Sequence, residues 1–189
     1  MRAENAVIVY LDEINFTKRS ISLREWSQKN SNLAIDQKDI MIGYRSVLAS
    51  ITSHEGIALR QYYAQAITGK DFADFLVKLR LRYPKRKLAV FMDQLRVHKE
   101  LEHVQPMYIR HKITPIFNVA YSPEFNPIEA VFSKVKAIFN RRRLNCLVRK
   151  IGFNIDETIK LAFRSISKDH CTACVRKSMH LLEKACNNV

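Results

Sequence analysis

Residues 120–136 read AYSPEFNPIEAVFSKVK and join two kinds of local structure. The first half favours turns, because two prolines and the polar residues beside them do not fit together into a regular helix or strand. The second half predicts a helix that begins after Asn126, a good N-cap, with Pro127 at the first helical position. Apolar residues then recur at helical spacing, namely Ile128, Val131, Phe132, Val135, Ile138 and Phe139. The stretch therefore predicts a surface loop that leads into a helix anchored on a core.

Glu129 falls in the first turn of this helix, where two roles are open to it. It can close a capping box with Asn126, in which the two side chains satisfy backbone N–H groups at the helix start. It can also be held rigidly towards a metal ion. The choice between the two roles depends on the acids found elsewhere in the chain.

Two other acidic residues follow short apolar runs. Asp12 comes after residues 6–11 (AVIVYL), and Asp93 comes after residues 87–92 (KLAVFM). Nearly continuous apolar runs of this length predict strands covered on both faces. If the two strands are neighbours, about 4.8 Å apart, their terminal carboxylates come close enough to share a cation. Glu13 is left out of this set, because alternation along a strand turns it to the opposite side.

Together these blocks resemble the catalytic domain of the mariner-type DDE transposases and of related bacterial insertion-sequence enzymes. The matching pieces are residues 9–13 (VYLDE), 91–94 (FMDQ) with 98–99 (HK), and 121–129 (YSPEFNPIE) with 133–136 (SKVK). The last block is the most specific of the three. The resemblance runs from Val7 to the final helix, and it departs at residues 94–97 (QLRV), where small residues are expected.

The resemblance implies an α/β fold of the RNase H-like, retroviral integrase type, with a mixed five-stranded sheet flanked by helices. The first and fourth principal strands are then adjacent and parallel, which puts Asp12 beside Asp93 while Glu129 approaches from its helix. We expect residues 1–189 to form a single DDE catalytic domain. The N-terminal helix-turn-helix module of full-length relatives is expected to be absent from it.

The same resemblance implies a metal-dependent DNA endonuclease. Asp12 would bridge two Mg²⁺ ions, Asp93 would hold one and Glu129 the other, and Mn²⁺ can substitute. Carboxylates suit such hard cations, and two metals about 3.5–4 Å apart stabilise the attacking and leaving oxygens of a phosphodiester. Water would cut double-stranded DNA at the transposon ends, and the freed 3′-hydroxyl would attack target DNA. Two alternatives stay open: an RNase H-like nuclease without strand transfer, and a non-catalytic DNA-binding remnant of a transposase.

Composition agrees with a globular protein that binds nucleic acid. The 189 residues are 47% hydrophobic, and four glycines and five prolines leave no room for a flexible linker. A net charge of +14 favours a polyanionic partner, and we expect a homodimer or higher assembly on DNA. No apolar run approaches the length of a membrane span. The protein is therefore expected inside the cell, in the nucleus of a eukaryotic host or the cytoplasm and nucleoid of a bacterium.

Basic residues gather where the predicted helix continues beyond Glu129. No acid occurs from Ala130 to Ile155, a segment rich in lysine and arginine. The candidate DNA contacts are Lys134, Lys136, Arg141, Arg142, Arg143, His98 and Lys99. A solvated helix face is the alternative for such a run, but its continuity with the Glu129 helix favours a track for DNA phosphates.

The remaining segments predict an alternation of strands and helices. We expect a short strand at 21–23, two antiparallel strands at 39–53 and 56–67, a helix ending before Pro84, and a strand at 113–119. A helix interrupted near Pro106 is expected at 98–112, the Glu129 helix to about 145, and a helix or pair at 156–185. Cys171, Cys174, His180 and Cys186 are residue types of a zinc knuckle, but their helical pattern favours buried thiols on a final helix.

Overall fold

The computed structural model describes residues 6–17 and 43–187, so the strand predicted at 21–23 lies outside the described residues. The strands are β1 (Ala6–Phe16), β2 (Arg45–Thr52), β3 (Gly56–Tyr63), β4 (Lys87–Met92) and β5 (Ile113–Phe117). The helices are α2 (Gly69–Arg82), α3 (Gln105–Arg110), α4 (Pro127–Val148), α5 (Ile155–Arg164) and α6 (Lys168–Asn187). Two short 3-10 turns, η2 (Arg96–Lys99) and η3 (Pro123–Phe125), complete the order.

The five strands form one mixed sheet in the order β3-β2-β1-β4-β5. The neighbouring pair β1 and β4 is parallel, as is the pair β4 and β5, whereas β1–β2 and β2–β3 are antiparallel. The expected adjacency of the first and fourth strands is therefore confirmed. One detail of the prediction is wrong. β1 continues to Phe16, because alternating buried residues follow the apolar run, so Asp12 lies within the strand and not at its end.

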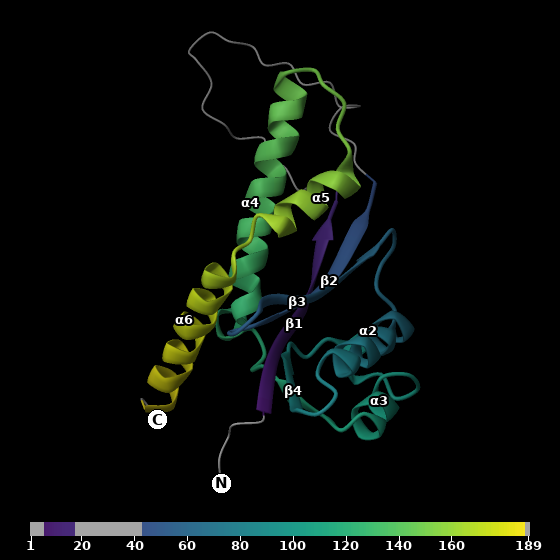
Figure 1. Ribbon diagram of the computed structural model, residues 1–189, viewed down its shortest axis with the longest axis vertical. Coiled ribbons are helices and arrows are strands. Elements are labelled where there is room, and N and C mark those ends of the chain that lie inside the picture. Colours follow the sequence, from purple (N-terminus) through teal and green to yellow (C-terminus); the bar gives the residue numbers. More distant parts are fainter. Residues whose placement is uncertain (1–5, 18–42, 188–189) are drawn as a thin grey trace.

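Helices cover both faces of the sheet, with α4, α5 and α6 on one side and α2 and α3 on the other (Figure 1). Alternate side chains of β1 pack into the apolar cores on the two faces of the sheet. Tyr10, Ile14 and Phe16 pack towards α4 and α5, and Val9 and Leu11 pack towards α2. Asp12 shares the parity of Tyr10 and Ile14, so it belongs to the face that α4 covers.

Local signals explain where several elements begin and end. Thr68 caps α2 through a capping box with Asp71, and Gly56 adopts a φ of 78° at the turn between β2 and β3. The helix expected at 98–112 is wrong in extent. Its first part is the turn η2, and α3 begins only at Gln105, because Pro106 lacks an N–H and is tolerated only in a first helical turn. α4 runs to Val148, slightly beyond its predicted end.

The final helix carries the three cysteines of the predicted motif. All three are free thiols, but the prediction that they are buried is wrong for Cys186, which is exposed near the end of the helix, whereas Cys171 is buried and Cys174 is partly buried. Within residues 6–17 and 43–187, no group of three His, Cys, Asp or Glu side chains is arranged to hold a metal ion. None of the described helices is both long and apolar enough to cross a membrane.

Candidate active site

Asp12 lies within β1 and Asp93 directly follows β4, the neighbouring strand. The register of β1 against β4 pairs Tyr10 with Phe91, and two further residues along each chain bring Asp12 level with Asp93. Neighbouring strands run about 4.8 Å apart, so the two carboxylates are held near each other by the backbone. This is the juxtaposition that the resemblance implied for the first two acids.

The carboxylate of Asp12 is almost entirely buried, with 5% of the residue exposed. Its Oδ1 accepts a hydrogen bond from the backbone N–H of Glu13 at 2.7 Å. Its Oδ2 accepts one from Nδ2 of Asn126 at 3.1 Å. Neither donor carries a charge, so a buried anion here is left without a cationic hydrogen-bond partner.

Asn126 explains how the helix α4 is joined to this carboxylate. It occupies the N-cap position as predicted, but its side chain makes no hydrogen bond to the helix backbone. Its amide donates to Asp12 instead, while its Oδ1 is buried and accepts no hydrogen bond. The capping box with Glu129 is therefore not formed. Glu129 is exposed in the first turn of α4, where its backbone N–H donates to the carbonyl of Asn126 and its side chain makes no hydrogen bond or ion pair with a described residue.

The electrostatics of Asp12 reflect burial and the neighbouring acids. Burial, followed by the negative charge of Asp93 and with a smaller part from Glu129, raises the pKa of Asp12 to about 8. Asp93 and Glu129 thus both act on the pKa of Asp12, although the three acids do not converge into a ready three-ligand cage among the described residues. A buried carboxylate with two acidic neighbours is a donor set that a divalent cation would neutralise. The residues present fit such an ion.

His98 connects Asp93 to the opposite face of the sheet. Its Nδ1 lies 2.8 Å from Oδ1 of Asp93, and its Nε2 lies 3.7 Å from Oε1 of Glu13. The ring is fully buried and stacks on Phe72 of α2, with 4.5 Å between the ring centres. Burial disfavours the charged imidazolium, but the two flanking carboxylates outweigh it and raise the pKa of His98 to about 9.

The prediction that His98 contacts DNA is therefore wrong, because a fully buried ring cannot reach a phosphate. The prediction that Glu13 turns to the opposite side of β1 from Asp12 is confirmed, since its carboxylate faces the buried His98 on the α2 side of the sheet. Lys99 remains exposed, where its Nζ donates to Oε1 of Gln94 at 2.9 Å and lies 4.8 Å from the centre of the Phe117 ring.

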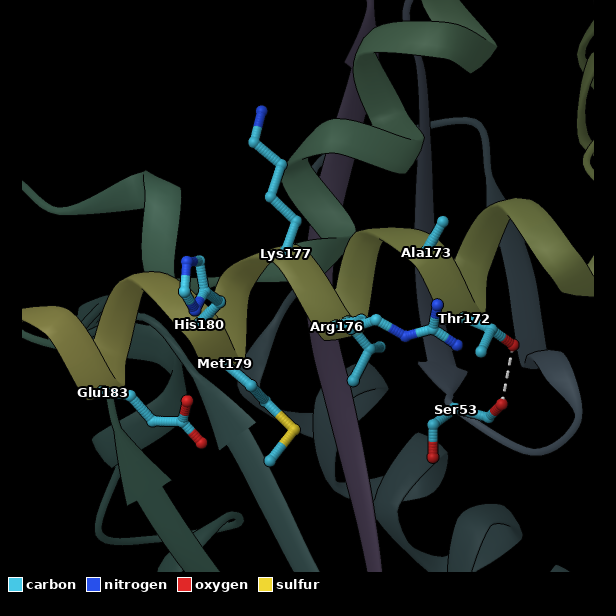
Figure 2. A pocket seen from close by; sticks show the side chains of 9 residues that line it. Ser53, Thr172, Ala173, Arg176, Lys177, Met179, His180 and Glu183 are labelled. Carbon is cyan, nitrogen blue, oxygen red and sulfur yellow. Dashed lines mark hydrogen bonds between the residues drawn. The ribbon is translucent and has the colours of Figure 1, made fainter.

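The final helix α6 supports the loop that leads to Glu129. The hydroxyl of Ser178 donates to the carbonyl of Phe125 in η3 at 2.6 Å. The hydroxyl of Thr172 donates to the carbonyl of Ser53 in the β2–β3 turn at 2.7 Å. Figure 2 shows this second contact at the edge of a groove of about 700 Å³ along α6. None of the three acids lines this groove, so it is separate from the candidate active site.

The basic residues of α4 divide into two groups. Lys134, Lys136, Arg141 and Arg142 are exposed, as a phosphate track requires. Arg143 is fully buried, so the expectation that it contacts DNA is wrong. Consecutive helical residues point about 100° apart, and the third arginine of this run falls on the inward face of α4. The pKa of Arg143 is lowered by burial.

The sequence did not predict three side-chain contacts around the site. They are those of Asn126 with Asp12, of Glu13 with His98, and of Ser178 with the carbonyl of Phe125. Only Asn126 carried a local signal, because it stands beside Pro127 and Glu129 in the most specific motif. The partners of the other two come from segments far away in the chain, so neither could be found from local pattern.

The DDE superfamily endonuclease family matches residues 7–149, which include all three acids. The chain belongs to the DDE superfamily endonucleases. None of the curated proteins matches it significantly.

Solved structures share the fold of this family member. The Mos1 strand transfer complex aligns with a TM-score of 0.62 at 15% identity, covering 94% of this chain and 52% of that one. The Mos1 paired-end complex with the left transposon end gives a TM-score of 0.63 at 13% identity, covering 95% and 54%. The catalytic domain of Mos1 mariner transposase gives 0.56 at 10%, covering 90% and 76%.

A simian T-cell lymphotropic virus intasome also aligns, with a TM-score of 0.56 at 11% identity, covering 82% of this chain and 46% of that one. The chain thus spans about half the length of the intasome protein and of the proteins in the two Mos1 complexes. The expected RNase H-like fold of the transposase and integrase type, with its mixed five-stranded sheet, is confirmed by these likenesses.

Proposed function

We propose that this chain is the catalytic domain of a DNA transposase, which cuts double-stranded DNA in a metal-dependent reaction and joins the resulting 3′-hydroxyl to target DNA. The observation that carries the proposal is the buried carboxylate of Asp12, flanked by Asp93 and Glu129 in a member of an endonuclease family. Among proteins of this fold, the Mos1 complexes are named for strand transfer and for paired transposon ends.

In this proposal Asp12, Asp93 and Glu129 hold Mg²⁺, for which Mn²⁺ can substitute. A structure of the Mos1 catalytic domain is described with Mn, which supports the choice of ion. Bound divalent ions would polarise the scissile phosphate and stabilise the attacking and leaving oxygens. The chain's own contribution is rigidity: Asn126 fixes Oδ2 of Asp12, and His98 fixes Oδ1 of Asp93.

The proposed partner is double-stranded DNA, both as transposon end and as target. Support comes from the net charge of +14 and from the exposed Lys134, Lys136, Arg141 and Arg142 on the same helix as Glu129. Contacts of this kind hold the backbone without reading sequence. We also propose that two or more copies assemble on DNA, as a reaction that joins two ends to one target requires.

Single substitutions that remove one charge test the acids. Asp12→Asn, Asp93→Asn and Glu129→Gln should each reduce Mg²⁺-dependent nicking of a supercoiled plasmid to background. Glu124→Gln is the matched control, since Glu124 is an exposed acid of η3 just before the same helix. Melting curves with and without Mg²⁺ give a second measurement, because an ion that binds only the folded state raises its melting temperature. The rise should vanish in the three variants and persist in the control.

A labelled oligonucleotide with a free 3′-hydroxyl separates the alternatives. A transposase joins it to plasmid DNA, a nuclease without strand transfer cuts the plasmid but joins nothing, and a non-catalytic remnant does neither. Full nicking activity in Asp93→Asn, with an undiminished Mg²⁺-induced rise in melting temperature, would refute the assignment of the acids.

A further inference from the structure

Tyr121 stands out in the loop between β5 and η3. Its side chain is fully exposed, with a relative accessibility of 102%, so it packs against nothing in the described structure. Its backbone lies in the left-handed region, with a φ of 59°. A bulky residue is disfavoured there because its Cβ crowds the following carbonyl, and such strain persists only when the surroundings impose it.

The other left-handed residues in the described chain have an ordinary explanation. Lys112 and Lys150 adopt φ values of 50° and 53° just beyond the ends of α3 and α4. Helices commonly end with such a residue, which lets the last carbonyls find hydrogen bonds. Tyr121 follows no helix, so its conformation is not a helix stop. The strained backbone and exposed ring of Tyr121 therefore need an explanation other than the end of a helix.

The loop that carries Tyr121 is tied to the candidate active site. The backbone N–H of Asn118 donates to the carbonyl of Met92, the residue before Asp93, at 2.7 Å. The Asn118 amide donates to the carbonyl of Ser122 at 2.7 Å, which closes the loop around Tyr121. Beyond the loop, Asn126 donates to Asp12. Tyr121 is therefore presented by a loop that is hydrogen-bonded to the residue before Asp93 and that leads on to Asn126, the partner of Asp12.

The first acid is recessed below the surface. Asp12 is 5% exposed in the middle of a strand, and a duplex whose nucleotides beside the phosphate have left their regular stack fits a recessed carboxylate better than a regular duplex does. Unstacking a base step has an unfavourable free energy, and proteins commonly offset it with a side chain that takes the place of the displaced neighbour. An exposed aromatic ring serves any base, because every base has a π-face.

We propose that Tyr121 is a stacking platform for an unpaired nucleobase next to the phosphate that is cut. The ligand is a base of either strand, recognised by its face and not by its hydrogen-bonding edge. The inference rests on the proposed function, since it assumes that DNA is brought to the three acids. It adds a binding residue that contacts substrate without touching the metal.

Binding of two fluorescein-labelled duplexes, one fully paired and one with a single unpaired base, tests the platform. Fluorescence anisotropy is measured in Ca²⁺ with the full chain. The wild type should prefer the duplex with the unpaired base by roughly fivefold to a hundredfold, the range expected for one aromatic stack. Tyr121→Ala should lose the preference, Tyr121→Trp should keep it, and affinity for the paired duplex should stay unchanged.

Two further variants keep the test clear of folding defects. Ile109→Ala removes another highly exposed apolar side chain and should leave the preference intact. Tyr121→Gly should melt no lower than the wild type, because glycine relieves the left-handed strain, yet it should lose the preference. Preference retained in Tyr121→Ala, or absent from the wild type, overturns the platform.

Plasmid nicking by the wild type tests the proposed function independently of the preference for an unpaired base. Nicking in Mg²⁺ without any preference for the unpaired base overturns the platform alone. A Tyr121-dependent preference without nicking supports the platform and overturns the proposed reaction.

Discussion

Replacing Asn126 with alanine distinguishes a helix cap from a brace for the first acid. In the structure the amide gives its hydrogen bond to the buried Asp12 and none to the backbone of α4. Such a bond contributes about 1–3 kcal/mol, the upper end applying when the acceptor is charged. Asn126→Ala should therefore lower the free energy of unfolding by about that amount. Urea unfolding followed by circular dichroism, in buffer with EDTA, gives the value.

A double-mutant cycle tests whether the loss of stability in Asn126→Ala comes from its hydrogen bond to Asp12. In an Asp12→Ala background the amide has no carboxylate to hold, so Asn126→Ala should then cost little. The loss of the unsatisfied Oδ1 of Asn126 occurs in both backgrounds and cancels. Thr68→Ala is the control for a true cap, because Thr68 accepts from the backbone of α2, and it should cost about 0.5–2 kcal/mol in either background.

The cycle has a clear negative result. If Asn126→Ala costs the same with and without Asp12, to within about 0.5 kcal/mol, then Asn126 stabilises α4 and not the carboxylate. The link between the helix that carries Glu129 and the strand that carries Asp12 would then fail as an explanation of the site.

Three further predictions concern the basic residues of α4, the partner of Asp93 and an ion pair at the start of α5. The double variant Arg141→Ala and Arg142→Ala should bind duplex DNA with a shallower dependence of log affinity on log salt concentration, by roughly 0.9 in slope for each phosphate that is no longer neutralised. Its melting temperature should stay unchanged. An unchanged slope would show that these two residues lie on a solvated helix face and do not contact phosphates. His98→Ala should weaken Mg²⁺ binding roughly 10–100-fold, measured from the metal-induced rise in melting temperature, because it frees the second carboxylate to rotate; equal affinity would show that the ring is only structural. The hydrogen bond from Arg45 lowers the pKa of Asp156 below its ordinary 3.8, so its stabilisation is present above about pH 4 and lost as the pH falls further. Arg45→Leu should therefore cost less than about 1 kcal/mol at pH 7 and progressively less as the pH falls below about 4, as measured by urea unfolding, and a cost that does not change with pH would exclude the ion pair as its cause.

Features that depend on neighbouring residues were predictable from the sequence. The runs before Asp12 and Asp93 indicated strands because buried strands need apolar residues in succession. Asn126 and Pro127 indicated the start of α4, because an N-cap and an N1 proline are signals that lie within a single turn. The order of strands and helices then followed, and the family resemblance supplied the pairing of β1 with β4.

Features that depend on distant partners were not predictable. The Asn126 side chain was expected to satisfy its own helix, but Asp12, 114 residues away, is the acceptor that the fold brings to it. His98 was expected at the surface because it stands beside Lys99, yet it fills a site between Phe72 and Asp93. Polar residues such as these change role with tertiary contacts, whereas an apolar run keeps its role in almost any context.

The contact of α6 with η3 shows that the segment matched by the family is shorter than the segment that packs into one fold. The family match stops at residue 149, yet Phe163 and Val175 beyond it complete the core against α4. A fragment ending at residue 149 would uncover that apolar face to water and release the loop held by Ser178. We expect such a fragment to aggregate although it retains all three acids of the candidate active site. The smallest part of this chain that we expect to fold is thus larger than the part that the family match covers.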